Sequence, residues 1–247
     1  MRTIRRISAA FQLLDSYSKG AVAGASILVD GCRMPFVSKG DGTYVFSDLP
    51  PTPHTYTISA PGYCTACRQL PAAPPYMPEV VLLQHAPGAP ALARMAYFRL
   101  RFLAEGRPLH RQMVRVTLLT PVGGLRLVEG AKAGDYALAL AGNYAAGMLF
   151  QPCCPQEAPG SELLLTGYDQ AAKRYTLQAP LDAPLKRGTL LRPVWDLETD
   201  GDGVAILPAV GLFLQREEVE FSFVANQQEQ RLVTAPPSPS CNLTVTF

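Results

Sequence analysis

The chain has 247 residues and a formal net charge of +2, with 48% apolar and 17% charged residues. This length allows two domains of ordinary size or three small ones, with enough apolar material for packed cores. Beyond Arg2, Arg5 and Arg6 there is no basic cluster, which argues against nucleic acid as a partner. The 20 glycines and 23 prolines favour short strands and tight turns over long helices.

The start of the chain does not have the pattern of a targeting segment. The apolar run after the arginines covers only residues 9–14 and contains Gln12, whereas a secretory signal needs roughly 7–15 apolar residues. Other apolar runs fall short of the ~20 residues of a membrane helix. We therefore expect synthesis in the cytoplasm without a signal peptide, no membrane insertion, and reduced thiols at the six cysteines.

One sequence pattern occurs twice. Residues 38–63 and 78–83 run through an Asp-Gly turn, a short strand, a Leu-Pro corner, an alternating strand, a Pro-rich loop and a closing strand. The same order recurs in residues 198–210, 218–225 and 242–247. Repetition of this kind predicts two tandem β-sandwiches.

The first predicted domain spans residues 1–84. Apolar alternation and turn residues predict strands over residues 9–14, 25–30, 32–38, 54–59 and 80–83, with a hairpin turn at Asp41-Gly42. Residues 64–78 are predicted to be a loop, because their prolines cannot donate to a ladder. Residues 85–94 have the composition of a linker.

The second predicted domain spans residues 95–247. Phe98, Leu100 and Phe102 alternate with Arg99 and Arg101, which predicts a strand with a charged outer face.

More than seventy residues separate Thr120 from the second Asp-Gly turn at Asp202-Gly203, too many for a loop inside a compact domain. We predict an inserted β subdomain over residues 125–195 that forms a small barrel, with a hairpin of residues 163–166 and 174–177. Residues 139–146 could instead form one helical turn.

The cysteines and acidic residues suggest metal sites, but their spacing argues against each. Cys64 and Cys67 lack a second pair that could complete four zinc ligands, because the vicinal Cys153 and Cys154 rarely face one metal. Asp200 and Asp202 hint at a calcium loop, yet the first repeat has Gly40-Asp41-Gly42 at the same place, which favours a shared β-turn. We expect no metal and no cofactor.

No catalytic constellation stands out. The chain has neither a Gly-x-Ser-x-Gly elbow nor a phosphate-binding Gly-rich loop, and its three histidines lie next to Pro-containing loops. We therefore expect no enzyme activity. Tyr136, Tyr144 and Tyr168 could form a carbohydrate-binding face, or could pack in the small core and at a protein interface.

Three sets of residues are predicted to contact other protein subunits, and the first is the N-terminal arm with Arg2, Arg5 and Arg6. Arg99, Arg101, Arg115 and Arg126 could line one sheet face, either solvated or paired with an acidic neighbour. Residues 242–247 alternate, which puts Leu243, Val245 and Phe247 on one face, and as an edge strand they would let a neighbour extend the sheet. The candidate interface residues are Arg2, Arg5, Arg6, Arg99, Arg101, Arg115, Leu243, Val245 and Phe247.

Residues 11–83, and more weakly 97–247, resemble the carboxypeptidase-regulatory-like and transthyretin-like β-sandwich family. The resemblance rests on Gly24-Ala25 before one strand and Pro61-Gly62-Tyr63 after another, although the usual Pro-Gly corner is Pro51-Thr52-Pro53 here. It implies an all-β fold of two transthyretin-like, Ig-like sandwiches.

The insert is similar to small β modules of bacterial phage tail and baseplate proteins, through Gly134-Asp135, Glu162, residues 177–181 and residues 188–194. Together the two resemblances imply a non-catalytic structural subunit of a phage tail or phage-tail-like contractile injection particle, whose partners are other subunits or further copies of itself. The alternative is a surface adhesin or a carbohydrate-binding accessory module.

Overall fold

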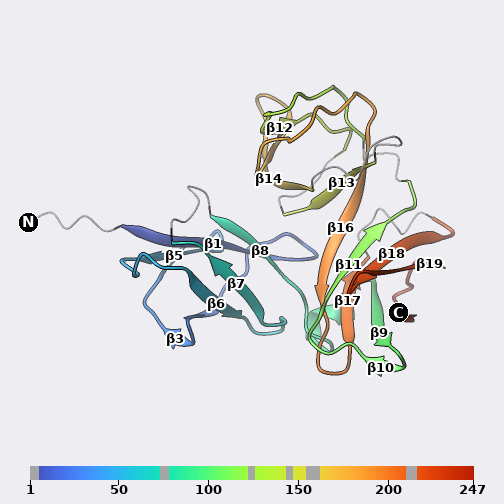
Figure 1. Cartoon of the computed structure of the whole chain (residues 1–247), viewed down its shortest axis with the longest axis horizontal. Coiled ribbons are helices and arrows are strands. Elements are labelled where there is room, and N and C mark those ends of the chain that lie inside the picture. The colour runs from blue at the N-terminus through green and yellow to red at the C-terminus, as the bar shows by residue number, and fades with distance from the viewer. Residues whose placement is uncertain (1–5, 73–77, 122–125, 143–146, 154–161, 210–215) are drawn as a thin grey trace, which may run out of the picture. The chain divides into compact units, whose positions relative to one another are not determined.

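A computed structural model describes residues 6–72, 78–121, 126–142, 147–153, 162–209 and 216–247. These residues form only β-strands and their connections, apart from one short 3-10 helix, η1 (Pro90–Arg94) (Figure 1). It divides into two compact units, Met1–Ala93 and Arg94–Phe247. Within the described ranges, no helix has the length and apolar character needed to cross a membrane.

The first unit is a sandwich of two four-stranded sheets. One sheet has the order β4-β5-β1-β8, formed by β1 (Ile7–Asp15), β4 (Val37–Ser38), β5 (Thr43–Ser47) and β8 (Glu79–Leu83). The other has the order β3-β2-β6-β7, formed by β2 (Ser26–Val29), β3 (Cys32–Arg33), β6 (His54–Ser59) and β7 (Ala66–Leu70). The core is rich in buried aromatic rings, contributed by Phe11, Tyr44, Phe46 and Tyr56.

The structure differs from three expectations in this unit. The single strand expected over residues 32–38 is two short strands, β3 and β4, which belong to different sheets. The expected loop of residues 64–78 contains β7, which pairs with β6 and ends at Leu70, just before the first proline of the segment. The expected linker of residues 85–94 begins with a buried residue, because His85 bonds to Asp15 at the end of β1.

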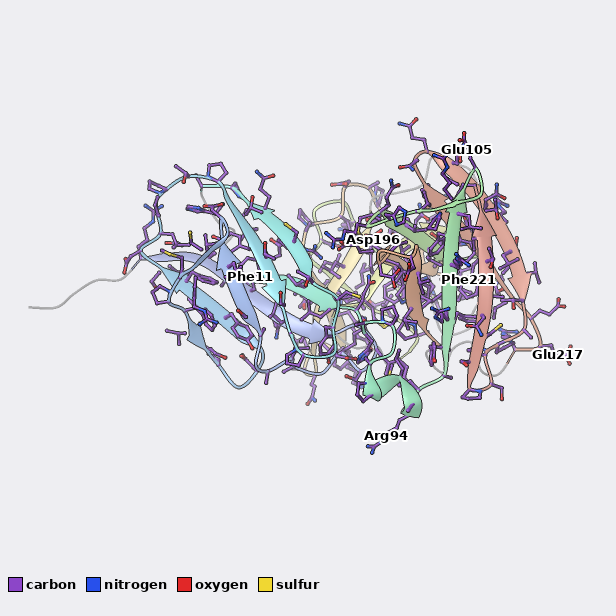
Figure 2. All side chains as sticks on the ribbon, turned by 90° about the horizontal axis from the view of Figure 1, so that it is seen from below. Phe11, Arg94, Glu105, Asp196, Glu217 and Phe221 are labelled. Atoms are coloured by element: carbon purple, nitrogen blue, oxygen red, sulfur yellow. The ribbon has the colours of Figure 1, made fainter. Side chains whose placement is uncertain are left out.

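The second unit contains a sandwich of the same kind. One of its sheets consists of β9 (Tyr97–Ala104), β10 (Arg107–Pro108), β17 (Val204–Pro208) and β20 (Ser240–Thr246). The facing strands are β16 (Leu190–Glu198), β11 (Met113–Leu118), β18 (Val219–Ala225) and β19 (Gln228–Thr234), in that order. Phe98, Phe102, Phe221 and Phe223 pack between the two layers, and Figure 2 shows Phe221 among these strands.

A small barrel is inserted between β11 and β16. It contains β12 (Ala137–Leu138), β13 (Leu149–Cys153), β14 (Leu163–Asp169) and β15 (Arg174–Leu177), which continue the sheet in the order β12-β15-β14-β13-β16. Leu127 bridges to Leu140 while Arg126 bridges to Leu190, and these contacts close the sheet on itself. The predicted barrel-like insert and its hairpin are therefore confirmed. The long strand β16 serves both cores, pairing with β13 in its first half and with β11 in its second (Figure 1).

The two sandwiches repeat one topology. The order β3-β2-β6-β7 corresponds to β16-β11-β18-β19, and β5-β1-β8 corresponds to β17-β9-β20. The two Asp-Gly turns also correspond: Gly42 accepts a hydrogen bond from the N–H of Leu13 on β1, and Gly203 accepts one from Phe102 on β9. Both glycines have positive φ, 79° and 73°. The internal repeat seen in the sequence is thus a repeat of fold.

Candidate functional site

The strand β20 forms one edge of its sheet. It pairs in parallel with β9, from Ser240 opposite Tyr97 to Thr246 opposite Leu103, and no other described strand pairs with it. Its seven residues contain neither a charge nor a proline. Natural edge strands usually carry such features, because an unprotected row of N–H and C=O groups recruits another strand.

Other long edges in the described part of the chain are better protected. The strand β19 carries Glu229 and Arg231, β7 carries Arg68, and β8 carries Glu79. At the opposite edge of the sheet that contains β20, β17 ends at Pro208 and has all five residues buried. The edge of β20 is therefore the strongest candidate for strand addition.

The inner face of β20 is used within the unit. Val245 is only 4% exposed, and Leu243 and Phe247 pack against the same core. The Phe247 ring stacks near Phe102 with centroids 6.3 Å apart. The prediction that Leu243, Val245 and Phe247 share a face is confirmed. These side chains hold β20 on its own sandwich, so the backbone edge, and not their apolar surface, is what β20 offers to a partner.

The predicted arginine face is split between two sheets. Arg99 and Arg101 lie exposed on the outer face of β9, opposite Asn242 and Thr244 of β20. Arg115 lies on β11 in the other sheet, where its Nε and Nη2 donate to the two oxygens of Asp196 at 2.8 and 3.1 Å. It also pairs with Glu162. The expectation of one face shared with Arg115 was therefore wrong, since β9 and β11 belong to opposite layers.

The ion pairs of Arg115 link the sandwich to the barrel. Asp196 lies on β16, and Glu162 directly precedes β14. The hydrogen bonds to Asp196 outweigh partial burial and raise the pKa of the Arg115 guanidinium. Because Arg115 is paired with both carboxylates inside the second unit, it is not a free cation that could bind a partner.

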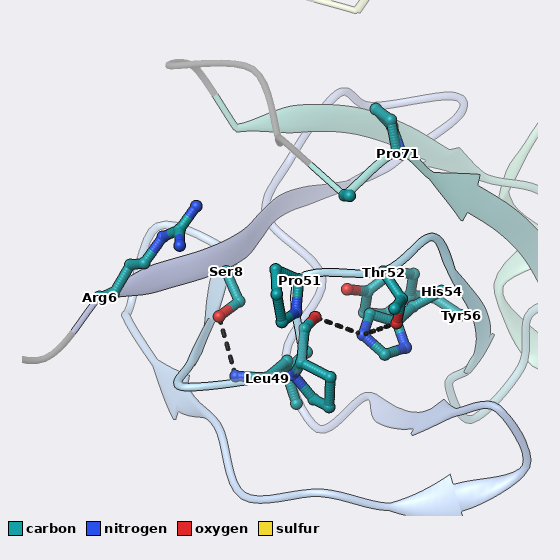
Figure 3. A pocket seen from close by; sticks show the side chains of 10 residues that line it. Arg6, Ser8, Leu49, Pro51, Thr52, His54, Tyr56 and Pro71 are labelled. Carbon is teal, nitrogen blue, oxygen red and sulfur yellow. Dashed lines mark hydrogen bonds between the residues drawn. The ribbon is translucent and has the colours of Figure 1, made fainter.

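Of the three N-terminal arginines, Arg2 and Arg5 lie outside the described residues. The backbone of Arg6 pairs with Asp48, since its carbonyl accepts from the Asp48 N–H. Arg6 also lines a small pocket with Ser8, Pro51 and His54 (Figure 3).

The histidine in this pocket is not arranged for catalysis. His54 Nδ1 lies 2.6 Å from Asp30 Oδ2, and Nε2 lies 2.9 Å from the carbonyl oxygen of Pro50. Both partners accept, so both ring nitrogens donate, and the hydrogen bonds to Asp30 and Pro50 raise the pKa of His54. Ser8 Oγ accepts from the N–H of Leu49. Neither nitrogen of His54 is left to take a proton from Ser8.

A buried polar cluster was missed by sequence reasoning. Asp15 Oδ2 lies 2.7 Å from His85 Nε2 and accepts from the Tyr63 hydroxyl at 2.8 Å, while Oδ1 accepts from the N–H groups of Tyr17 and Ser18. The side chains of Asp15 and His85 are 9% and 6% exposed. Asp15, Tyr63 and His85 lie far apart in the sequence, so no local spacing pattern could have predicted that their side chains meet.

Protonation in this cluster favours a structural role. Burial acts to raise the pKa of Asp15, but hydrogen bonds from Ser18 and Tyr63 and the charge of His85 lower it overall. Burial and the bond to Asp15 raise the pKa of Tyr63 to about 12, so its hydroxyl remains protonated at neutral pH. The cluster joins the end of β1 to the segments that follow β6 and β8.

The acidic residues considered as a calcium loop form a β-turn. The N–H of Gly42 donates to the carbonyl of Lys39, as the N–H of Gly203 does to that of Asp200, and this common backbone pattern confirms the shared turn. Asp200 Oδ1 in addition accepts from the N–H groups of Asp202 and Val204. Among the described residues, no three His, Cys, Asp or Glu side chains are grouped to hold a metal ion.

The cysteines and tyrosines are dispersed. Cys67 is a free thiol exposed on β7, whereas Cys64 precedes that strand and its Sγ lies 3.8 Å from the carbonyl oxygen of His85. Cys154 lies outside the described residues. On the barrel, Tyr136 and Tyr168 are 60% and 47% exposed, and Tyr144 is not among the described residues.

Fold and site together define a two-sandwich, all-β protein with an inserted barrel, in which β20 is the least protected long edge among the described strands. No protein-family model matches the chain, and no curated protein matches it. Among solved structures, the Bacillus anthracis TIE protein is similar with 9% identity and a TM-score of 0.23. The alignment covers 97% of this chain and 50% of that one. Similarity of this size assigns neither fold nor function.

Proposed function

We propose that this protein is a non-catalytic assembly component that joins other protein chains through the free edge of β20. The observation that carries the proposal is a seven-residue edge strand without charge or proline, held rigidly by its inner side chains. Strand addition at such an edge gains main-chain hydrogen bonds along its whole length. The rigid core beneath means that little order has to be gained on binding.

The state of the polar clusters supports a non-catalytic role. His54 and Asp15, the residues most suggestive of acid-base chemistry, have their hydrogen-bonding atoms engaged within the first unit. Arg115 is likewise held by two carboxylates. General acid-base catalysis requires a group that can reach a substrate proton, and these groups are satisfied internally.

The particle that we propose is a phage tail or a phage-tail-like contractile injection system. The proposal rests on the resemblance of the insert to tail and baseplate β modules, and on a construction from tandem sandwiches, which suits a protein that presents surfaces to neighbours. The partners would be other subunits of the particle, and the protein would reside in that particle after synthesis in the cytoplasm.

The test is incorporation into a particle in the native cells. A tagged full-length chain is expected to sediment in a fast particle fraction on a density gradient. An edge-blocked variant, Asn242→Lys/Thr244→Lys, is expected to remain in the slow fraction, because lysines on an edge strand oppose strand addition. Val233→Lys, an exposed change on the edge strand β19, is the matched control and should sediment like the unaltered chain. Slow sedimentation of the unaltered chain, or equal incorporation of the β20 variant, would refute the proposal.

A further inference from the structure

Two unpaired cations lie one strand away from the free edge of β20. Arg99 and Arg101 are exposed on the outer face of β9, and neither forms an ion pair with a described residue, whereas Arg68, Arg115, Arg174 and Arg231 each do. Their positions two residues apart on one strand face put them about 7 Å from each other. Carboxylates on alternate residues of another strand would have the same spacing.

The strand between these arginines and the free edge has small side chains on that face. Arg99 lies opposite Asn242 and Arg101 opposite Thr244, with Ser240 and Thr246 in the flanking pairs. None of these residues carries a charge. A strand added to β20 would lie about 10 Å from β9, because neighbouring strands are about 4.8 Å apart. A long arginine side chain and a glutamate can together span that gap over a short threonine or asparagine.

We propose that the strand which adds to β20 comes from a different protein and carries carboxylates on two alternate residues, facing Arg99 and Arg101. This inference rests on the proposed function and names the chemistry of its partner. Arginine favours such pairing because its planar guanidinium can donate two parallel hydrogen bonds to one carboxylate.

The long edge strands of a second copy of this chain fit the site poorly. Its own β20 would bring only Ser240, Asn242, Thr244 and Thr246 to this face, and none is acidic. Its β19 and β8 each carry only one glutamate: Glu229 already accepts from Ser222 and Arg231, and Glu79 pairs with Arg68. Charge complementarity therefore favours an acidic extended segment of another protein over self-association.

The experiment uses two probe peptides on the full chain labelled with ¹⁵N. The acidic probe is acetyl-TVEVEVT-amide and the neutral probe is acetyl-TVQVQVT-amide, which differ only in the two alternate carboxylates. In NMR titrations we expect both to shift the amides of residues 240–246, and the acidic probe to bind up to about tenfold more tightly at low salt, as two exposed ion pairs would give. The difference should shrink as salt is raised.

Matched variants separate this inference from general electrostatic attraction. Arg99→Gln/Arg101→Gln is expected to abolish the preference for the acidic probe, while Arg33→Gln/Arg187→Gln, which removes the same charge from exposed positions outside this sheet, should retain it. Unchanged β20 amide shifts in the free variants will show that the sheet is intact. Equal binding of both probes to the unaltered chain would overturn the acidic partner and leave strand addition standing. Absence of shifts at β20 with either probe would overturn both.

Discussion

The two sandwiches share one strand order but connect equivalent strands differently. In the first, β2 and β3 are joined by the tight turn Asp30-Gly31, where both residues have positive φ. In the second, the equivalent strands β11 and β16 are separated by the whole barrel, yet they keep an antiparallel register from Met113 opposite Glu198 to Thr117 opposite Val194. The comparison shows that a whole domain can replace a hairpin turn as long as the two strands remain paired. The reason is that the chain then enters and leaves the inserted domain at adjacent points.

The closing strands differ as well. In the first sandwich β8 carries Glu79, which pairs with Arg68, and the next residues are fastened through His85 to Asp15. In the second sandwich β20 has no charged residue and no comparable clasp among the described residues. The two sandwiches thus have the same topology, but the edge at β8 is protected by a charged residue and the edge at β20 is not.

The largest expected effect tests the equivalence of the two turns. A Cβ at Gly203 would lie 2.8 Å from the carbonyl oxygen of Phe102, and φ there is 73°. Gly203→Val should lower the free energy of unfolding of the second sandwich by about 3 kcal/mol or more. The single tryptophan, Trp195, packs against that core, so its fluorescence in urea reports the change. Gly201→Ala, which meets open space at a φ outside the left-handed region, is the control. A Gly203→Val variant as stable as this control would contradict the view that Gly203, like Gly42, is required by a positive φ and a close backbone contact.

The second-largest expected effect on stability comes from the buried polar cluster of Asp15, Tyr63 and His85 in the first sandwich. Asp15→Asn removes the charge that holds His85 and one of the acceptors that serve Tyr63 and Ser18, so the first unit should lose about 2–4 kcal/mol of stability. Hydrogen exchange of β1 and β8 amides measures this loss. Because the pKa of Asp15 is lowered on folding, its contribution is present above its unfolded pKa of about 3.9 and fades as pH falls through the folded value. A change in the free energy of unfolding below about 0.5 kcal/mol would show that the cluster does not stabilise the first unit.

Removing the barrel tests the insertion directly. Replacing residues 119–192 by Asp-Gly, the turn of the first sandwich, joins Leu118 to Pro193 as a two-residue hairpin. The second sandwich should still unfold cooperatively with a Trp195 transition, weakened by about 1 kcal/mol through loss of the Arg115–Glu162 pair. Loss of that transition would mean that β16 needs the barrel in order to pair with β11.

The smallest effect is a pH dependence in the first sandwich. Folding raises the pKa of His54, so its stabilising contribution is complete below the unfolded value of about 6.5 and disappears as pH rises through the folded one. The gap in Tm between the unaltered chain and His54→Gln should be a few degrees near pH 5.5 and should shrink towards pH 9. His110→Gln, at an exposed position, is the control. A gap that stays constant over this range would contradict the ionised pair with Asp30.

Much of the fold followed from local patterns. The Asp-Gly turns, the alternation of Phe98, Leu100 and Phe102, and the excess length after Thr120 predicted both sandwiches and the inserted barrel. The strand β7 was missed because the nearby prolines dominated the segment, although the first of them, Pro71, lies just beyond its end. The candidate site was predicted in part: the edge and the inward face of β20 were expected, whereas Arg115 was assigned to the wrong sheet.

The sequence by itself determined the period of each strand and the sites of its turns, because these depend on residues that are neighbours in the chain. Only the tertiary structure decided which strands share a sheet, and hence that Arg99 and Arg101 lie beside the open edge while Arg115 is held by Asp196 and Glu162. It also brought Asp15, Tyr63 and His85 together across seventy residues. Such pairings arise from long-range strand order, which local periodicity does not encode.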